Sequence, residues 1–209
     1  MARLPDPPTP DDLRARLPAK TVEFQTGRIL HRVYKRGGRH PAAWGAFRHY
    51  GPVADCRFDH HPDPKGIHDE GILYCAPDPV TCLAEAFQDT GIINRMFEEP
   101  YLAAFATVSA VRLLDLTGLW STQAGASMSI GTGSRGIARK WSRTIYLAYP
   151  DVQGLLYCSA MNANAPSVAL FERARAALPG SPQRDVPLSS GVVATLLGDA
   201  ATKLRYGLV

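Results

Sequence analysis

The sequence predicts a single α+β domain, in which a mixed β-sheet core is flanked by helices. Apolar, β-branched runs typical of strands are interspersed with periodic helical segments, without the regular alternation of a doubly wound fold. The chain has 209 residues, of which 45% are hydrophobic and 20% are charged, as is usual for a folded domain. The sequence contains no repeat or linker that would divide it, so we expect one domain.

An arm and a short helix are expected over residues 1–27, ahead of a main domain over residues 28–209. Four of the first ten residues are proline, which favours extended backbone. Thr9 can cap a short helix in which Leu13 and Leu17 lie four residues apart on one face.

Short apolar and β-branched runs predict the strands of the main domain. These runs lie at residues 28–34, 71–76, 101–116, 154–160 and 167–171, and the third is long enough for one strand or two. Residues 36–70 are rich in Gly, Pro, His and Asp, which predicts a long surface loop with little regular structure.

A helix is expected directly after the second run. Asp78 followed by Pro79 is a favourable helix start, because Asp caps free N–H groups and Pro fits the first turn. Apolar residues then recur at the spacing of one helix face, at Val80, Leu83, Ala84 and Phe87. Glu85 is left on a different face.

Two more helices are expected in the C-terminal half. Ser134 can cap a helix over residues 135–148, which Pro150 ends, and the tail over residues 189–204 has a helical pattern. Residues 121–136 are small, polar and glycine-rich, and are expected to form a flexible loop. This segment ends in GTGSRG, but a polar stretch precedes it where a dinucleotide-binding loop would follow a strand, so a Rossmann site is not expected.

The charge balance is mildly basic, with a net charge of +4. The densest basic run is Arg32, Lys35, Arg36 and Arg39, which is either a solvated face or an anion site for phosphate groups. We expect no direct contact with nucleic acid. The N-terminus lacks the apolar core of a signal peptide, and no run approaches the about 20 apolar residues that span a bilayer. A cytoplasmic location is therefore expected.

The sequence predicts no metal site. The four cysteines, at 56, 75, 82 and 158, include no CxxC pair and are too few for a fold held together by disulfides. His60 and His61, with Asp59, Asp63 and His68, do not have the spacing of a zinc site, and a polar loop is expected there.

Four segments, in order and spacing, resemble the RES-domain toxin family, which is named for an Arg, a Glu and a Ser. The segments are residues 30–34 (LHRVY), 56–59 (CRFD), 71–76 with 82–87 (GILYCA and CLAEAF), and 154–160 (GLLYCSA). The resemblance is clearest over residues 28–172. The loop around Arg57 departs from the common pattern, because it has Phe where the family often has Trp and lacks a glycine directly before the arginine.

The resemblance implies a fold similar to ADP-ribosyltransferases and an activity that depletes NAD⁺ as a toxin. NAD⁺ would be the substrate, and no separate cofactor is implied. The partner implied is a helix-turn-helix antitoxin protein, while the oligomeric state, including a homo-oligomer, is left open.

The residue types in these segments suit cleavage of the nicotinamide–ribose bond, which develops positive charge on the ribose. Glu85 could stabilise that charge or orient an attacking water. Arg32 and Arg57 could bind the pyrophosphate, because a guanidinium grips phosphate oxygens in bidentate fashion. Ser159 could hydrogen-bond the ribose or the nicotinamide side. Of these, Glu85, Arg32 and Ser159 are the expected catalytic residues.

The remaining expected contacts to NAD⁺ come from Tyr74, Tyr34 and Asn162. Tyr74 could flank the nicotinamide ring. Each also has a structural interpretation, because a strand tyrosine is often core and Asn162 could be a turn residue.

Three functions follow from this pattern. The first is an NAD⁺-cleaving enzyme with water or phosphate as acceptor, and the second is transfer of ADP-ribose to a protein by the same site. The third is a non-enzymatic module that binds a nucleotide or a partner protein, which the basic run over residues 32–39 would favour.

Overall fold

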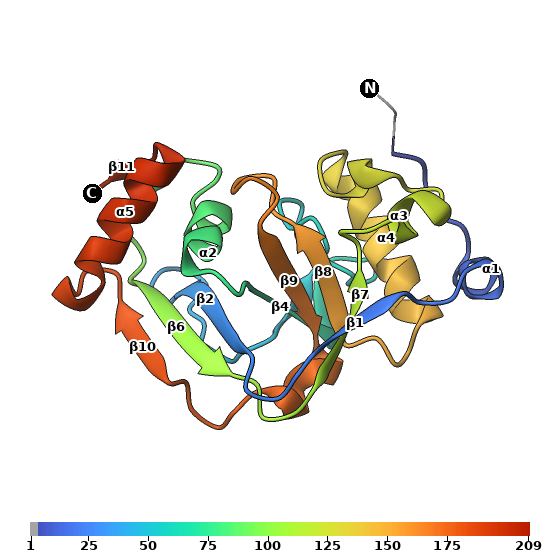
Figure 1. Ribbon diagram of the computed structural model, residues 1–209, viewed down its shortest axis with the longest axis horizontal. Helices are drawn as coiled ribbons and strands as arrows, with labels where there is room; N and C mark the ends of the chain where they lie inside the picture. The colour runs from blue at the N-terminus through green and yellow to red at the C-terminus, as the bar shows by residue number, and fades with distance from the viewer. Residues whose placement is uncertain (1–3) are drawn as a thin grey trace.

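The computed structural model describes residues 4–209 and contains three β-sheets with flanking helices (Figure 1). The largest sheet has the strand order β1 (Thr21–Phe24), β7 (Val111–Asp115), β8 (Gly154–Cys158), β9 (Pro166–Phe171), β4 (Gly66–Cys75) and β3 (Arg48–Gly51). Strands β7 and β8 are parallel and the other neighbours are antiparallel. The predicted α+β class, with a mixed sheet and flanking helices, is confirmed.

Residues 4–209 also form two smaller sheets, five α-helices and three short 3₁₀ helices. The smaller sheets have the orders β10 (Arg184–Pro187), β6 (Pro100–Ala106), β2 (Ile29–Lys35) and β11 (Gly207–Leu208), β5 (Ile92–Ile93). The helices are α1 (Pro10–Arg16), α2 (Pro79–Ala86), α3 (Trp120–Gln123), α4 (Arg135–Ala148) and α5 (Ala194–Leu204). Short 3₁₀ helices are η1 (Met128–Ile130), η2 (Glu172–Ala177) and η3 (Gly191–Val193). Among residues 4–209, no helix is both long and apolar enough to cross a bilayer.

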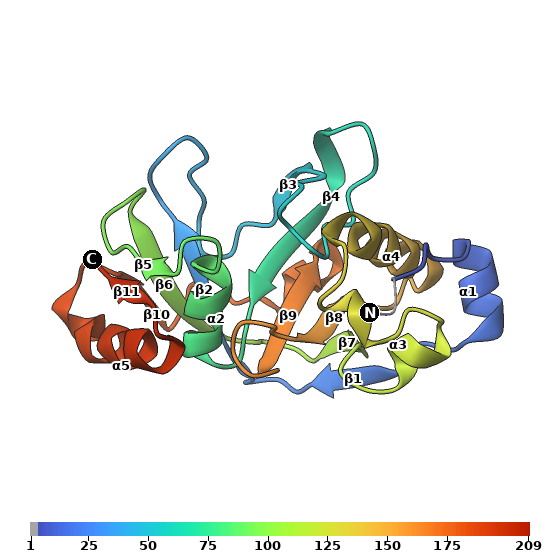
Figure 2. The ribbon, with the colours of Figure 1, turned by 90° about the horizontal axis from the view of Figure 1, so that it is seen from above.

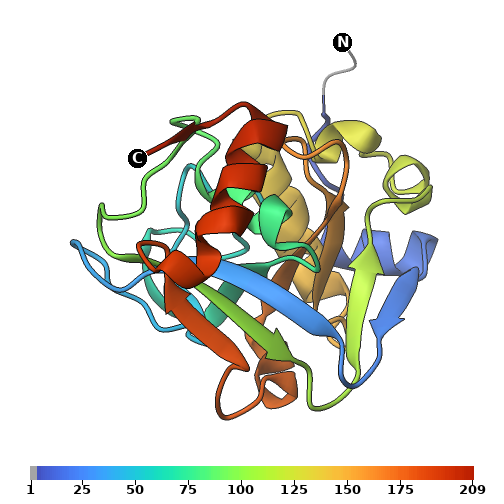
Figure 3. The same ribbon diagram turned by 60° about the vertical axis from the view of Figure 1, so that its left-hand side comes forward.

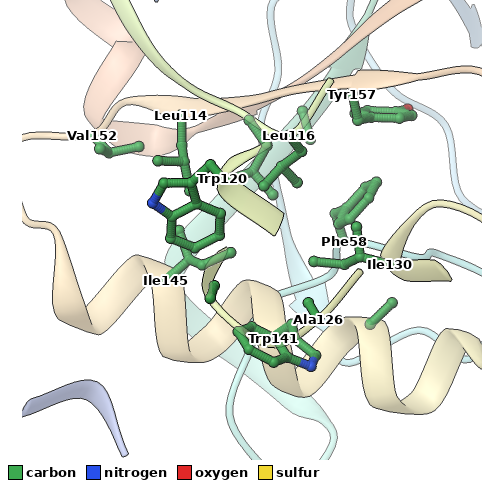
Figure 4. Packing of buried hydrophobic residues seen from close by; sticks show 14 of the residues in the cluster. Phe58, Leu114, Leu116, Trp120, Ala126, Ile130, Trp141, Ile145, Val152 and Tyr157 are labelled. Atoms are coloured by element: carbon green, nitrogen blue, oxygen red, sulfur yellow. The ribbon is translucent and has the colours of Figure 1, made fainter. Parts of the chain in front are cut away.

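Helices α1 and α4 pack on one face of the six-stranded sheet. Trp141 and Ile145 of α4 are buried in one cluster with Leu114 of β7 and Trp120, and Figure 4 shows Ile145 beside Trp120 and Trp141 beside Ala126. The four-residue spacing of Trp141 and Ile145 places both on the same side of the helix, and this apolar stripe drives the packing.

The other face of the six-stranded sheet packs against the three-stranded sheet of β10, β6 and β2 (the small sheet). Leu73 and Leu170 of the large sheet contact a cluster that includes Leu30 of β2 and Phe105 of β6. Helices α2 and α5 cover the opposite face of the small sheet, through a cluster that includes Leu83, Leu197 and Leu102 (Figure 3). Helix α2 therefore lies at the edge where the two sheets meet.

Helix α2 begins as the sequence predicts. The Asp78 carboxylate accepts hydrogen bonds from the N–H groups of Val80 and Thr81, both at 3.2 Å, and Pro79 is the first helical residue. Leu83 and Ala84 are buried, which leaves Glu85 half-buried on a different face.

Two predicted loops contain some regular structure, so those predictions are wrong in part. Residues 36–70 include β3 and the first half of β4, which pair with each other and form the polar outer part of the sheet. Apolar residues do not alternate with polar ones there, because this part of β4 is not covered by the core. The sequence therefore lacks the pattern that marks a strand. Residues 121–136 include most of α3 and all of η1, anchored by the buried side chain of Ile130.

Residues 101–116 form two strands in different sheets, β6 and β7, which is one of the two predicted possibilities. The predicted helices over residues 10–17, 135–148 and 189–204 correspond to α1, α4 and η3 with α5. The short strands β1, β5, β10 and β11 were not predicted.

Candidate active site

A cavity of about 260 Å³ lies between α2, the strand ends beside it and the start of α4. Figure 2 shows α2 and α4 on either side of strands β4 and β9. The side chains that line the cavity and carry polar or aromatic groups are Asp55, Cys56, Arg57, Tyr74, Cys75, Cys82, Glu85, Gln88, Arg135, Tyr157, Cys158 and Ser167. Three predicted site residues, Arg57, Tyr74 and Glu85, are thereby brought together from separate parts of the chain.

Ser159 fixes the Glu85 carboxylate. Its hydroxyl donates a hydrogen bond to Glu85 Oε1 and accepts bonds from the N–H groups of Met161 and Asn162, both at 3.2 Å. A serine hydroxyl has one donor and two acceptor positions, so these three bonds use its full capacity. Ser159 is buried and does not line the cavity, so it contacts Glu85 from the protein interior.

The charge of Glu85 is under opposing influences. Burial raises the pKa of its carboxyl, whereas the Ser159 hydrogen bond and the positive charges of Arg57 and Arg135 lower it, and burial is the larger effect. The carboxylate is thus partly dehydrated and faces guanidinium groups across the cavity.

Arg57 lines the cavity from the loop between β3 and β4. Its Nη1 donates to the carbonyl oxygen of Gly133 at 2.6 Å, which joins its loop to the segment before α4. Burial and the neighbouring charge of Arg135 both lower the pKa of Arg57. The two like-charged side chains line the same cavity, where their charges oppose each other.

Phe58 contacts both tyrosines that line the cavity, Tyr74 and Tyr157. The hydroxyl of Tyr74 accepts a hydrogen bond from the Phe58 N–H at 3.2 Å, and the ring of Tyr157 lies 4.6 Å from the Phe58 ring. Tyr157 was not predicted as a site residue, although it belongs to the segment GLLYCSA that carries Ser159.

Arg32 and Tyr34 do not line the cavity. Arg32 Nη1 donates to the carbonyl oxygens of Trp44 and Ala46 at 2.8 and 2.9 Å, and burial lowers the pKa of Arg32 to about 10. Tyr34 donates to the Asp185 carboxylate at 2.7 Å. In this structure both side chains hold the surrounding chain in place.

Asn162 also lies outside the cavity lining. Its side-chain amide donates to Asp78 Oδ2 at 3.2 Å and to Thr81 Oγ1 at 2.8 Å. It therefore ties the segment after β8 to the first turn of α2, the helix that carries Glu85.

Arg135, like Tyr157, lines the cavity and was missed by sequence reasoning. It is the first residue of α4 and comes from the GTGSRG segment. The 3₁₀ helix η1 precedes this segment where a dinucleotide-binding fold would have a strand, in agreement with the rejection of a Rossmann site. The signal that could have identified Arg135 is a lone cation in a run of small polar residues.

The His-rich segment is buried in the fold. Asp59, His60 and His61 are all buried, Arg48 pairs with Asp59 at 3.0 Å, and the His60 ring stacks on Tyr146 at 4.4 Å. This differs from the expected polar surface loop. Over residues 4–209, no group of three or more His, Cys, Asp or Glu side chains is arranged to hold a metal ion.

The family model of the RES domain matches residues 29–189. The chain belongs to the RES domain family. This confirms the family predicted from the four sequence segments, each of which contributes to the cavity lining, the first through Val33 and not through Arg32.

A solved structure has a fold similar to that of this chain. A chain of the M. tuberculosis MbcT–MbcA toxin–antitoxin complex is similar, with a TM-score of 0.56 and 17% identity over 83% of this chain and 90% of that chain. At this identity the similarity shows the fold. No curated protein matches the chain.

Proposed function

We propose that this RES-domain chain is a toxin-type enzyme that cleaves the nicotinamide–ribose bond of NAD⁺. The observation that carries the proposal is the half-buried Glu85 carboxylate, which Ser159 orients toward a cavity that also bears Arg57 and Arg135. Membership of the RES family supports it, as does the similarity of the fold to a chain of a toxin–antitoxin complex.

The chemistry needs an anion near the reacting sugar. When the bond between ribose C1′ and the nicotinamide nitrogen breaks, its electron pair leaves with neutral nicotinamide and positive charge develops on the ribose. A fixed carboxylate stabilises this charge more in the transition state than in the ground state. Glu85 would fill that role, and water or phosphate would then attack C1′.

The other residues divide into binding and positioning groups. Tyr74 and Tyr157 would flank the nicotinamide ring, and Arg57 would attract the phosphates. Ser159 and Asn162 would position Glu85 and its helix, and Arg32 would position the segment around Trp44 and Ala46 through its two hydrogen bonds.

An antitoxin partner is part of the same proposal. The solved chain with a similar fold comes from a toxin–antitoxin complex. We propose that a protein of the helix-turn-helix class covers the cavity of this chain and blocks NAD⁺ entry in the cytoplasm.

The proposal is tested by incubating the purified chain with NAD⁺, with and without inorganic phosphate, and measuring nicotinamide release and the ribosyl product. We expect release without any added protein. ADP-ribose as product would identify water as acceptor, and a phosphorylated product would identify phosphate. If a folded sample releases nicotinamide only when a protein acceptor is present, transfer to protein replaces this proposal, and no release at all contradicts both.

A further inference from the structure

We propose that Arg135 is a displaceable clamp for a diphosphate group, held beside the cavity by weakly bound carboxylates that the diphosphate replaces. The identity of the full substrate rests on the proposed function. The clamp itself requires only a nucleoside diphosphate.

The side-chain contacts of Arg135 with residues 4–209 are all long. Its nitrogens lie 3.7 Å from Asp55 Oδ1, 3.5 Å from Asp89 Oδ1 and 3.4 Å from Gln88 Oε1. A well-formed bond between a guanidinium and a carboxylate is about 2.7–2.9 Å long. The side chains of Asp55 and Asp89 are 79% and 70% exposed, so water screens both pairs strongly.

The position of these partners makes them competitors for a ligand. Asp55 belongs to the loop on one wall of the cavity, whereas Gln88 and Asp89 follow α2 on the other wall. The Arg135 guanidinium thus lies between the two walls, where its planar set of donors can reach an anion in the cavity.

A second cation stands beside Arg135. Arg57 lines the same cavity, and the charge of Arg135 destabilises its protonated form. Arg57 has one strong hydrogen bond, to the Gly133 carbonyl, which carries no full charge to offset the repulsion. An anion with two linked phosphates would relieve this repulsion by pairing with both side chains.

One of the two arginines expected to bind the pyrophosphate makes its contacts outside the cavity. Arg32 makes two hydrogen bonds to backbone carbonyls and lies outside the cavity lining. The structure therefore assigns the diphosphate subsite to Arg135 together with Arg57.

The test is calorimetric titration of the full chain with ADP and, separately, with adenosine, which lacks phosphates. We expect Arg135→Gln to weaken ADP binding about tenfold or more and to leave adenosine binding unchanged. Lys140→Gln is the matched control, because it removes one positive charge from the same helix but lies beside Asp6. Arg135→Lys should fall between wild type and Arg135→Gln, because it keeps the charge but loses the bidentate geometry.

Removing the competing carboxylates should have the opposite effect. We expect the double variant Asp55→Asn with Asp89→Asn to bind ADP more tightly, by about two- to fivefold. The double variant Asp151→Asn with Asp199→Asn removes the same charge at exposed positions and controls for the overall field. This arm does not depend on the Arg135→Gln variant being folded.

The clamp is overturned if wild type does not bind ADP, if Arg135→Gln changes ADP affinity less than twofold, or if the Asp55 and Asp89 changes weaken it. ADP binding that follows the expected pattern without NAD⁺ cleavage keeps the clamp and contradicts the proposed function. NAD⁺ cleavage combined with an ADP affinity that Arg135→Gln does not change keeps the proposed function and contradicts the clamp.

Discussion

Glu85 and Ser159 form a pair in which one side chain carries the charge and the other sets its direction. The hydroxyl of Ser159 has no bonding position left for a substrate, so its influence on the reaction passes through the Glu85 carboxylate. A hydrogen bond to a charged group contributes about 1.5–3 kcal/mol, which makes this contact a measurable one.

We expect Ser159→Ala to lower kcat/KM about tenfold or more at neutral pH and to move its acidic limb to higher pH. Burial already raises the pKa of Glu85, and the lost hydrogen bond stabilised the ionised form, so protonation would begin at a higher pH. The measurement is the pH profile of kcat/KM, with Ser181→Ala, at an exposed serine, as control. A limb that stays in place or moves to lower pH would contradict this role.

At the residue scale, sequence reasoning identified side chains whose chemistry is carried by local motifs. Glu85, Arg57 and Tyr74 were predicted and line the cavity. Arg135 was missed because nothing in its neighbourhood along the chain indicates that α4 begins beside α2. The backbone contacts of Arg32 depend on a segment more than ten residues away and were equally invisible.

Helix α2 carries Glu85, and its first turn is fixed from two sides. Asp78 caps the helix and also accepts a hydrogen bond from Asn162, which follows β8. The position of Glu85 relative to the sheet thus depends on this cap.

We expect Asp78→Ala to lower the free energy of unfolding by about 1–2 kcal/mol and also to lower kcat/KM, because the cap and one partner of Asn162 are lost. Thr9→Ala removes the cap of α1 and is the matched control. It should cost about 1 kcal/mol of stability and leave kcat/KM unchanged. The measurements are urea unfolding and NAD⁺ turnover, and equal activity of the two variants would argue against a special role for the α2 cap.

At the element scale, helices were predicted better than strands. Caps and apolar periodicity are local signals, and they identified α1, α2 and α4 with nearly correct ends. Strand β3 and the outer half of β4 were missed because these residues gain regular structure from pairing with each other and not from burial. Such pairing leaves little trace in the sequence.

The whole molecule is built in layers, and the buried polar segment over residues 59–61 lies within them. Burial alone would raise the pKa of Asp59, but the hydrogen bond from His61 and the charge of Arg48 lower it to about 2. Burial would also raise the pKa of Glu172, but the His60 ring, 3.7 Å away, and hydrogen bonds from the Gly71 N–H and the Tyr146 hydroxyl lower it to about 2. Both carboxylates are therefore stabilised in their ionised forms by the folded state.

We expect the free energy of unfolding to fall by several kcal/mol as the pH drops from about 5 to 2. The folded-state pKa values of Asp59 and Glu172 lie below the unfolded values of about 3.9 and 4.3, so their stabilisation is present above pH 4 and is lost below it. The measurement is urea unfolding at several pH values. Asp59→Asn should flatten this dependence, whereas Asp69→Asn, at an exposed position nearby, should not. A steep dependence retained in Asp59→Asn would contradict the assignment.

At the scale of the whole molecule, the fold class was predictable but the cavity was not. Mixed strands and helices indicate an α+β domain, whereas the cavity depends on long-range pairing such as β4 with β9 and β8 with β9. The resemblance of four segments to one family supplied the information that local patterns lack.

The most direct test of the central claim compares Glu85→Gln with Glu23→Gln in NAD⁺ turnover. Gln at position 85 keeps the shape and can still accept the Ser159 hydrogen bond, but it carries no charge, while Glu23 is exposed on β1 away from the cavity. We expect Glu85→Gln to lower kcat for nicotinamide release roughly 100-fold or more with a similar KM, and Glu23→Gln to match wild type. Turnover by Glu85→Gln within threefold of wild type would contradict the account.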